Sequence, residues 1–329
     1  MMESLYIDRR DTSLSVESER LIIHHPDMVR AQSVPLAHLR FVVISANTQL
    51  NSNVLQAFSK AGVACIVINP RKTDDMAFTM PFRHGHAERR LAQYATYHND
   101  ELRQHAAQKL VQFKILSQQR TLQRLLISQP QQRLALSRGI EKLNNIRQSL
   151  KEQNYTLESL RGFEGAAASG YFLALSYCVP ASLNFTGRNR RPPRDPINAA
   201  LSLTYSLIHY ECIRSLTAVG LDPLIGFYHD LSYKRESLAC DMVELLRGRI
   251  DHWVIKQFNQ QVLRIDHFSV DESVNGGCMM SKAGRANFYA AYEYQARHWR
   301  TLLRRIARQW LHALKPHFLT LSDEDNDDE

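Results

Sequence analysis

The sequence predicts an α+β protein in which a small β-rich N-terminal domain is followed by a larger all-α domain. The first eighty residues are broken into short apolar and alternating runs, as expected for half-buried strands. Residues 87–161 instead contain one proline and one glycine and are rich in Leu, Gln, Arg, Ala and Lys, most of which are good helix formers. The expected divisions are residues 1–80, a linker at 81–86, the helical domain at 87–321 and an acidic tail at 322–329.

Five runs in the first domain have the length and composition of strands. They lie at residues 5–7, 14–16, 21–23, 41–44 and 65–68. Between the last two, apolar residues recur at helical spacing from Leu50 to Ala61. Asn51 or Ser52 is the expected N-cap of this helix, and Gly62 is the expected stop.

Helical periodicity dominates the second domain. Val111, Ile115, Leu122 and Leu126 fall on one helical face, which we interpret as a buried stripe. Lys114, Arg120 and Arg124 lie elsewhere around the same cylinder. Further helices are predicted over residues 156–177, 196–218, 236–246, 250–263 and 283–314. The last eight residues hold six acids and no base, which is typical of a disordered tail.

The charge balance favours a polyanionic partner. The chain has 41 Lys and Arg against 33 Asp and Glu, and leaving out the acidic tail raises the net charge from +8 to +14. A body this basic attracts polyanions at long range, although the charge does not indicate a fold.

Cysteine usage and hydropathy point to one cellular compartment. The five cysteines are dispersed and form no C-x-x-C pair, which argues against a disulfide framework or a thiolate zinc site. The N-terminus has no apolar signal core, and the longest apolar stretch, residues 171–179, is far shorter than the ~20 residues of a membrane helix. We therefore expect a reduced, cytoplasmic, soluble protein with no membrane partner.

A glycine-rich helix carries the first candidate functional residue, Glu164. Gly162, Gly165 and Gly170 surround it together with a run of alanines, and each interior glycine costs a helix roughly 1 kcal/mol relative to alanine. Small residues let another backbone, of protein or nucleic acid, approach the carboxylate. The alternative is a tight helix–helix crossing in which Glu164 is a solvated surface acid.

A second segment places an imidazole close to two acids in the sequence. Pro223 and Gly226 put His229 in a loop or at a helix end, and Asp241 and Glu244 follow on neighbouring faces of the next helix. Carboxylate oxygens suit Mg²⁺ or Mn²⁺, and an imidazole ligand favours Mn²⁺. The alternative is a partly buried histidine beside ordinary exposed acids.

Two sets of arginines are candidates for contacts with phosphate. The first occupies a loop stiffened by two prolines, with Asp195 and Pro196 as the cap and first residue of the next helix; its arginines are Arg188, Arg190, Arg191 and Arg194. The second forms a stripe along one side of a helix, at Arg297, Arg300, Arg304 and Arg308. Like charges at that spacing repel, and a phosphate backbone would relieve the repulsion. The alternatives are local pairing with acids for the loop and a solvated face for the stripe.

Taken together, these segments resemble the CRISPR-associated protein one family, the integrases of CRISPR spacer acquisition. The resemblance rests on Glu164 in G-F-E-G, the R-N-R-R-P-P-R-D-P-I-N loop, and G-F-Y-H followed at fixed distances by Asp241 and Glu244. In the N-terminal half, L-Y-I-D and T-Q-L-N-S-N-V-L-Q-A-F agree with the family's β domain. The similarity extends from residue 4 to about 310.

The resemblance implies a catalytic role for the helical domain and a dimerising role for the β-rich domain. Residue by residue, it implies that Glu164, His229 and Glu244 are metal ligands and that Asp241 is a further catalytic or supporting acid. It also implies a homodimer, with two dimers bridged by CRISPR-associated protein two. The loop that follows His229 lacks the Gly-Arg-Pro sequence common in the family, and the acidic tail matches no family feature.

The implied reaction is a transesterification. With Mg²⁺ or Mn²⁺, the protein would join the 3′-hydroxyl ends of a captured duplex fragment to the CRISPR repeat, and with water as nucleophile the same site would be a DNA endonuclease. One alternative is a metal-dependent nuclease that acts on branched DNA in repair. Another is a non-catalytic DNA scaffold, which would have no need of a metal-ligand trio.

Overall fold

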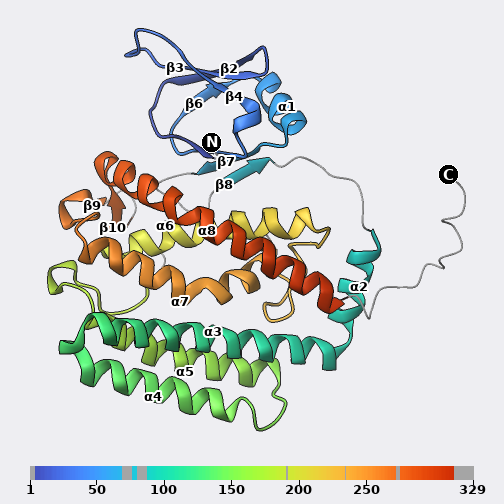
Figure 1. Cartoon of the computed structure of the whole chain (residues 1–329), viewed down its shortest axis with the longest axis vertical. Coiled ribbons are helices and arrows are strands. Elements are labelled where there is room, and N and C mark those ends of the chain that lie inside the picture. The colour runs from blue at the N-terminus through green and yellow to red at the C-terminus, as the bar shows by residue number, and fades with distance from the viewer. Residues whose placement is uncertain are drawn as a thin grey trace, which may run out of the picture. The chain divides into compact units, whose positions relative to one another are not determined.

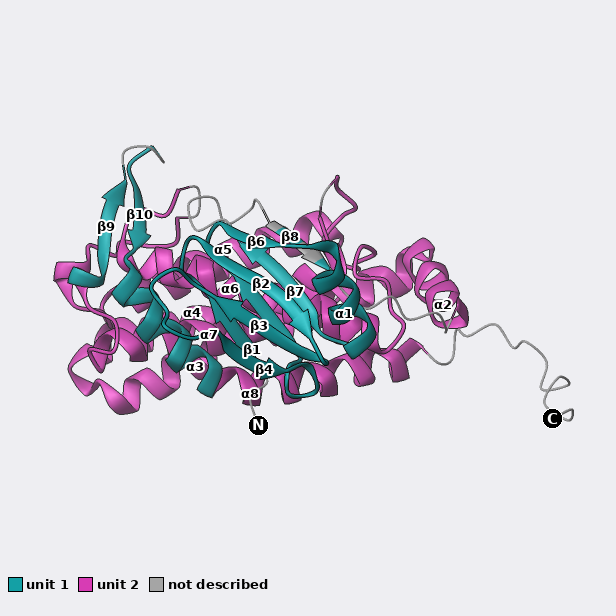
Figure 2. Cartoon of the chain, turned by 90° about the horizontal axis from the view of Figure 1, so that it is seen from above, with its two compact units in different colours: residues 1–84, 266–294 teal, residues 85–265, 295–329 magenta. Residues whose placement is uncertain are grey.

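The computed structural model describes residues 4–68, 76–79, 87–189, 192–233, 235–271 and 275–314. The predicted linker at 81–86 and the acidic tail at 322–329 lie outside this part of the chain. The chain divides into two compact units, coloured separately in Figure 2. Unit 1 contains residues 1–84 and 266–294, and unit 2 contains residues 85–265 and 295–329.

Unit 1 contains two four-stranded sheets. The first has the order β1-β5-β7-β8, with β1 (Ser4–Ile7), β5 (Phe41–Ile44) and β7 (Ala64–Ile68) parallel and β8 (Met76–Thr79) antiparallel. The second has the order β4-β3-β2-β6, with strands β4 (Gln32–Pro35), β3 (Arg20–His24), β2 (Thr12–Glu17) and β6 (Thr48–Leu50). All five predicted strands are present, and β4, β6 and β8 are additional.

The helix of unit 1 has the predicted ends. Helix α1 (Ser52–Ala61) begins after Asn51, whose side chain accepts the backbone N–H of Val54. It ends at Gly62, where φ is +73° and a side chain would be strained. Val54 and Phe58 are fully buried in a core shared with Leu21 and Val42 of the strands, so the apolar face of α1 closes this core.

The β-rich and helical character of the two parts confirms the α+β class, but unit 1 also takes in a segment from the region predicted as helical. Strands β9 (Phe268–Asp271) and β10 (Gly277–Met280) form an antiparallel hairpin. Helix α8 (Lys282–Leu314) follows, and its residues up to Tyr294 also group with unit 1. Gly284 allows this turn of α8 to approach the chain before the hairpin, because a Cβ there would lie 2.8 Å from the carbonyl oxygen of His267.

Unit 2 is a helical assembly around a long central helix, α3 (Asp100–Ser128). Figure 1 shows α3 beside α4 (Arg133–Ser149) and α5 (Leu157–Ser176), with which it packs. On another side α3 contacts α7 (Ser237–Asn259), and α7 in turn packs against α6 (Pro196–Ala218). Helix α2 (Ala87–His98) precedes α3.

A close crossing of α3 and α7 sets the position of the side chains described below. A Cβ at Gly248 would lie 2.6 Å from the carbonyl oxygen of Ser117, so only glycine allows the two backbones to touch here. Thr121 of α3 donates a 2.7 Å hydrogen bond to the Gly248 carbonyl. The two runs predicted at 236–246 and 250–263 are therefore one continuous helix through Gly248, which stops at Asn259.

Across the described ranges, we find no helix with the length and apolar character required to traverse a bilayer.

Candidate functional site

The loop that carries His229 is held against the start of α7 by one carboxylate. Asp241 accepts the backbone N–H groups of Phe227, Tyr228 and His229 at 2.7 to 3.0 Å, and its Oδ1 lies 2.6 Å from the Nδ1 of His229. Gly226 makes this approach possible, because a Cβ there would lie 2.8 Å from Asp241 Oδ2. An ionised carboxylate can accept hydrogen bonds but cannot donate them. The proton between Asp241 and His229 is therefore on Nδ1, and Nε2 is left for a metal or substrate.

Asp241 is therefore placed as a support for the histidine. Its side chain is fully buried, and both of its oxygens are engaged by donors from the loop. Asp241 was expected to be a further catalytic or supporting acid, on a helix face adjoining that of Glu244. The fold turns it toward the loop backbone instead, and it does not line the cavity described below.

Lys114 contacts both glutamates, although its position in the sequence predicted a place away from the buried stripe. Lys114 of α3 is only 4% exposed, because α3 is covered by helices on more than one side. Its Nζ pairs with Oε1 of Glu164, from α5, and lies 2.5 Å from Oε2 of Glu244, from α7. No local pattern around Lys114 predicts this contact, because it joins three helices that are distant along the chain.

Glu244 is buried but remains ionised. Burial by itself would raise its pKa, but the positive charges of Arg247 and Lys114 outweigh burial and hold the pKa of Glu244 below its ordinary value. The Nε of Arg247 lies 2.7 Å from the same oxygen that Lys114 contacts. Neither Arg247 Nε nor Glu244 Oε2 makes an aligned hydrogen bond, although the two atoms are close. Glu244 Oε2 therefore keeps a lone pair for a further cation.

The three residues expected to be metal ligands line one cavity. Glu164, His229 and Glu244 share a hollow of about 360 Å³ in unit 2 with Tyr228, Arg161, Asp230 and Arg235. Glu164 is the most accessible of the two glutamates, with a quarter of its side chain exposed. The alternative of Glu164 as a solvated surface acid leaves out two neighbours, since an imidazole and a second carboxylate line the same cavity.

Arginines around Asp230 form the rim of this cavity. The carboxylate of Asp230 pairs with Arg161 and lies 2.6 Å from Arg103. Desolvation would raise its pKa, but the hydrogen bonds from Arg103 and Arg161 outweigh desolvation and keep the pKa of Asp230 below its ordinary value. Arg161 and Arg235 thus place positive charge beside the two glutamates, where an anionic substrate would be favoured.

The glycines beside Glu164 leave one side of α5 open. A Cβ at Gly162 or at Gly165 would meet no atom of the chain within 4 Å. Gly170 differs, because a Cβ there would touch the side chain of Lys142 on α4. Close contact with a neighbouring helix is therefore found at Gly170, through the Lys142 side chain, and not at the two glycines that flank Glu164.

The cavity has the chemistry of a divalent-cation site, although its side chains are arranged around a lysine. Two carboxylates and an imidazole are a ligand set typical of Mn²⁺ or Mg²⁺. The Lys114 ammonium already lies between the carboxylates as a stand-in cation. Among the described residues no three His, Cys, Asp or Glu side chains converge closely enough to hold a metal as they stand, so binding would require the ammonium to yield its place.

The arginine loop is partly built into the fold. Asp195 caps α6 by accepting the backbone N–H of Asn198 at 2.8 Å, and Pro196 is the first helical residue, as predicted. Arg188 donates to Asn198 at 2.7 Å and to Ser202 at 3.0 Å. Arg194 is exposed. Two further predicted residues, Arg190 and Arg191, lie outside the described part of the chain.

The arginine stripe on α8 is interrupted. Arg297, Arg304 and Arg308 are exposed, but Arg300 is 4% exposed and its Nε donates a 2.6 Å hydrogen bond to the buried Glu211 of α6. Internal pairing, which the like charges of the stripe did not predict, therefore accounts for Arg300. This residue is not in a position to contact a phosphate.

The chain matches one protein family over most of its length. The model of the family described as CRISPR associated protein Cas1 matches residues 5–294. A relative from Thermodesulfovibrio yellowstonii named CRISPR-associated endonuclease Cas1 1 is 36% identical over 304 residues, which cover 92% of this chain and 94% of the relative.

Two solved structures have a similar fold. A casposase bound to an integration product superposes with a TM-score of 0.82 at 21% identity, covering 100% of this chain and 95% of the casposase. A chain from a Cas6-RT-Cas1–Cas2 complex also gives 0.82, at 19% identity, covering 98% of this chain and 36% of that larger chain. At these identities the similarity is one of fold.

Proposed function

This chain belongs to the Cas1 family, and from that premise we propose that it is a metal-dependent DNA integrase and endonuclease of CRISPR adaptation. The observation that carries the proposal is that Glu164, His229 and Glu244 line one cavity with arginines at its rim. The reaction joins the 3′-hydroxyl of a short duplex fragment to a phosphodiester in the CRISPR repeat. One phosphodiester replaces another, so no external energy source is required.

Glu164, His229 and Glu244 would hold the Mg²⁺ or Mn²⁺ ion. When bound, such an ion lowers the pKa of a hydroxyl nucleophile and neutralises charge at the scissile phosphate. His229 offers Nε2 because Asp241 occupies Nδ1, and Glu244 offers an ionised oxygen because Arg247 and Lys114 favour its charged form.

The other residues around the cavity bind and orient the substrate. Arg161 and Arg235 line the cavity and would neutralise phosphate charge there, while Lys114 would offset the repulsion between the two glutamates until a cation binds. The exposed flank of α5 at Gly162 and Gly165 gives a nucleic-acid backbone room to approach Glu164. Phosphate contacts of this kind position a duplex without reading its sequence.

Duplex DNA, a second copy of the chain and Cas2 are the partners we propose. The net charge of +14 outside the acidic tail supports a long polyanion as substrate. A structural neighbour is part of a Cas1–Cas2 complex and another is bound to an integration product, which supports assembly and integration by a protein of this fold. Arg194, Arg297 and Arg304 are exposed and remain candidates for contacts with DNA.

The relative's name, endonuclease, favours hydrolysis as a second activity of the same cavity. Water would take the place of the 3′-hydroxyl, and branched DNA would then be an alternative substrate. The two nucleophiles are distinguished by comparing fragments that end in a 3′-hydroxyl with fragments that end in a 3′-deoxy sugar. Joining requires the hydroxyl, whereas cleavage by water does not.

The proposal is tested with a matched pair of variants on α5. Glu164→Gln removes the charge of a ligand, whereas Glu158→Gln changes an exposed acid in the first turn of the same helix. In an assay reconstituted with Cas2, Mn²⁺ and a repeat-containing plasmid, Glu164→Gln should abolish joining and Glu158→Gln should retain it. Full joining by Glu164→Gln would refute the proposal, because the reaction would then not require the Glu164 carboxylate.

A further inference from the structure

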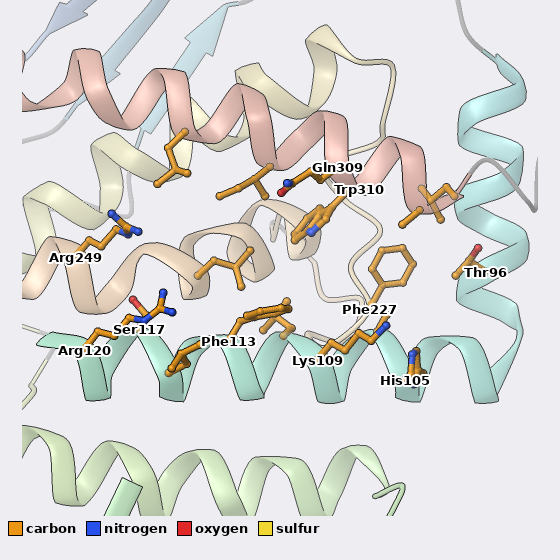
Figure 3. Close-up of a pocket in the computed structure, with 18 of the residues that line it drawn as sticks. Thr96, His105, Lys109, Phe113, Ser117, Arg120, Phe227, Arg249, Gln309 and Trp310 are labelled. Atoms are coloured by element: carbon orange, nitrogen blue, oxygen red, sulfur yellow. The ribbon is translucent and has the colours of Figure 1, made fainter. Parts of the chain in front are cut away.

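A second, larger cavity in unit 2 has no role in the proposed reaction. It has a volume of about 560 Å³ and lies among α3, α7 and the last turns of α8 (Figure 3). Its walls are mainly apolar, with Phe113 from α3 and Trp310 from α8 on facing sides, and Leu245 from α7 also lines it. Phe113 is 58% exposed, which is a high exposure for a phenylalanine side chain.

One end of this cavity concentrates positive charge that the described chain does not balance. Arg120 and Arg124 of α3 and Arg249 of α7 line it together. Burial lowers the pKa of the Arg249 guanidinium, and the neighbouring charges of Arg124 and Arg120 lower it further. No Asp or Glu is among the described residues that line the cavity, and like charges held together in this way favour an anionic occupant.

The chain that follows α8 has the matching chemistry. Leu314, the last described residue, itself lines the cavity. Beyond it the sequence continues as Lys315-Pro-His-Phe-Leu-Thr-Leu321 and then as an acidic block with six Asp and Glu from Asp323 to Glu329. Along the sequence, apolar residues are therefore followed by negative charge. The cavity has the corresponding order, with apolar residues near Leu314 and the arginines at the other end.

The length of this segment is sufficient. Helix α3 rises about 16 Å from Lys109, near the end of α8, to Arg120 at the arginine end (Figure 3). Nine residue-to-residue steps lead from Leu314 to Asp323 and span at most ~30 Å when extended. Pro316 would stop the helix within two residues of Leu314, so the chain can turn back along the cavity.

We propose that this cavity binds the chain's own C-terminal segment, residues 315–329. Phe318, Leu319 and Leu321 would cover the apolar wall around Phe113 and Trp310, and the acids that follow would pair with the arginine end. This segment fits better than duplex DNA, which presents its sugar–phosphate backbone and no apolar surface to that wall, and it brings apolar side chains and acids in the order in which the cavity could receive them. The binding is intramolecular, since the segment starts at a residue that already lines the cavity.

The test uses the full-length chain with the photoreactive residue benzoylphenylalanine in place of Phe318. Illumination followed by peptide mass spectrometry should give a crosslink within one chain, to the segments around Phe113 or Trp310. Phe113→Glu puts a charge into the apolar wall that Phe318 would cover, and should lower the yield roughly fivefold. Leu134→Glu, at a site on α4 outside the cavity that is 67% exposed, is the matched control and should leave the yield unchanged.

A second arm tests the charges. Changing the six acids of the tail to their amides should lower the crosslink yield, as should Arg120→Gln, whereas Arg138→Gln on the exposed face of α4 should not. Crosslinks to another surface, crosslinks that join two chains, or an unchanged yield in Phe113→Glu would overturn the proposal. So would a single-stranded oligonucleotide that abolishes the crosslink while the amide variant retains it, because the cavity would then be a nucleic-acid site.

Discussion

Replacing Lys114 with methionine tests how much the ammonium that contacts the two glutamates of the candidate site contributes to stability. Methionine keeps much of the length and the apolar stem but removes the ammonium that contacts both Glu164 and Glu244. Loss of one partner from a buried ion pair destabilises a protein by about 3–5 kcal/mol. The lower end applies here, because Glu244 keeps Arg247 at 2.7 Å and Glu164 is a quarter exposed.

The expected free energy of unfolding of Lys114→Met is thus about 3 kcal/mol below that of the native chain, measured by urea denaturation in EDTA with far-UV circular dichroism. Lys151→Met, at an exposed lysine in the turn after α4, should change it by less than about 0.5 kcal/mol. Addition of Mn²⁺ should stabilise Lys114→Met more than the native chain, because the ion no longer competes with an ammonium and ligand binding stabilises the folded state.

Two results would refute this reasoning. If Lys114→Met were as stable as Lys151→Met in EDTA, the contacts of Lys114 would not balance the buried glutamates. If Mn²⁺ stabilised the native chain and the variant equally, the ammonium would not lie where a divalent ion binds.

Three further predictions concern the scaffold of the site. Gly248→Ala should destabilise unit 2 by about 1–3 kcal/mol in urea, because the added Cβ meets the α3 backbone, whereas Gly162→Ala should be neutral or stabilising, because its Cβ meets nothing within 4 Å. Asp241→Asn should speed hydrogen exchange at the Phe227–His229 amides, which lose a charged acceptor. Burial raises the pKa of Asp251 from 3.8 to about 6, an effect that Tyr205 and Arg247 offset only in part. The folded state therefore binds this proton more tightly than the unfolded state, and the stability of the native chain falls as pH rises through that interval. The free energy of unfolding of Asp251→Asn should therefore rise relative to that of the native chain by roughly 3 kcal/mol between about pH 4 and pH 7.

Each of these has a result that would contradict it. Equal urea midpoints for Gly248→Ala and Gly162→Ala would mean that the α3–α7 crossing relaxes around a methyl group. Unchanged exchange in Asp241→Asn would mean that the loop holds its shape without the carboxylate. A stability difference between Asp251→Asn and the native chain that is constant with pH would mean that Asp251 titrates alike in the folded and unfolded states.

Local signals in the sequence were sufficient for most of the elements. The ends of α1 at Asn51 and Gly62 and the start of α6 at Asp195 were predicted because caps act within three or four residues of a helix end. The hairpin β9–β10 was missed because its strands are four residues long and lie among longer helical patterns, where periodicity gives little warning.

The interval between His229 and Glu244 and the glycines around Glu164 were sufficient to predict, from the sequence alone, which residues are candidates for the chemistry. The packing of the helices then determined what these residues contact. It brought Lys114 between two glutamates from other helices, turned Asp241 toward a loop backbone and paired Arg300 with Glu211. The physical reason is that these are contacts between residues from 12 to more than 100 positions apart. Helical spacing assigns a residue to a face, and only packing determines which partner that face meets.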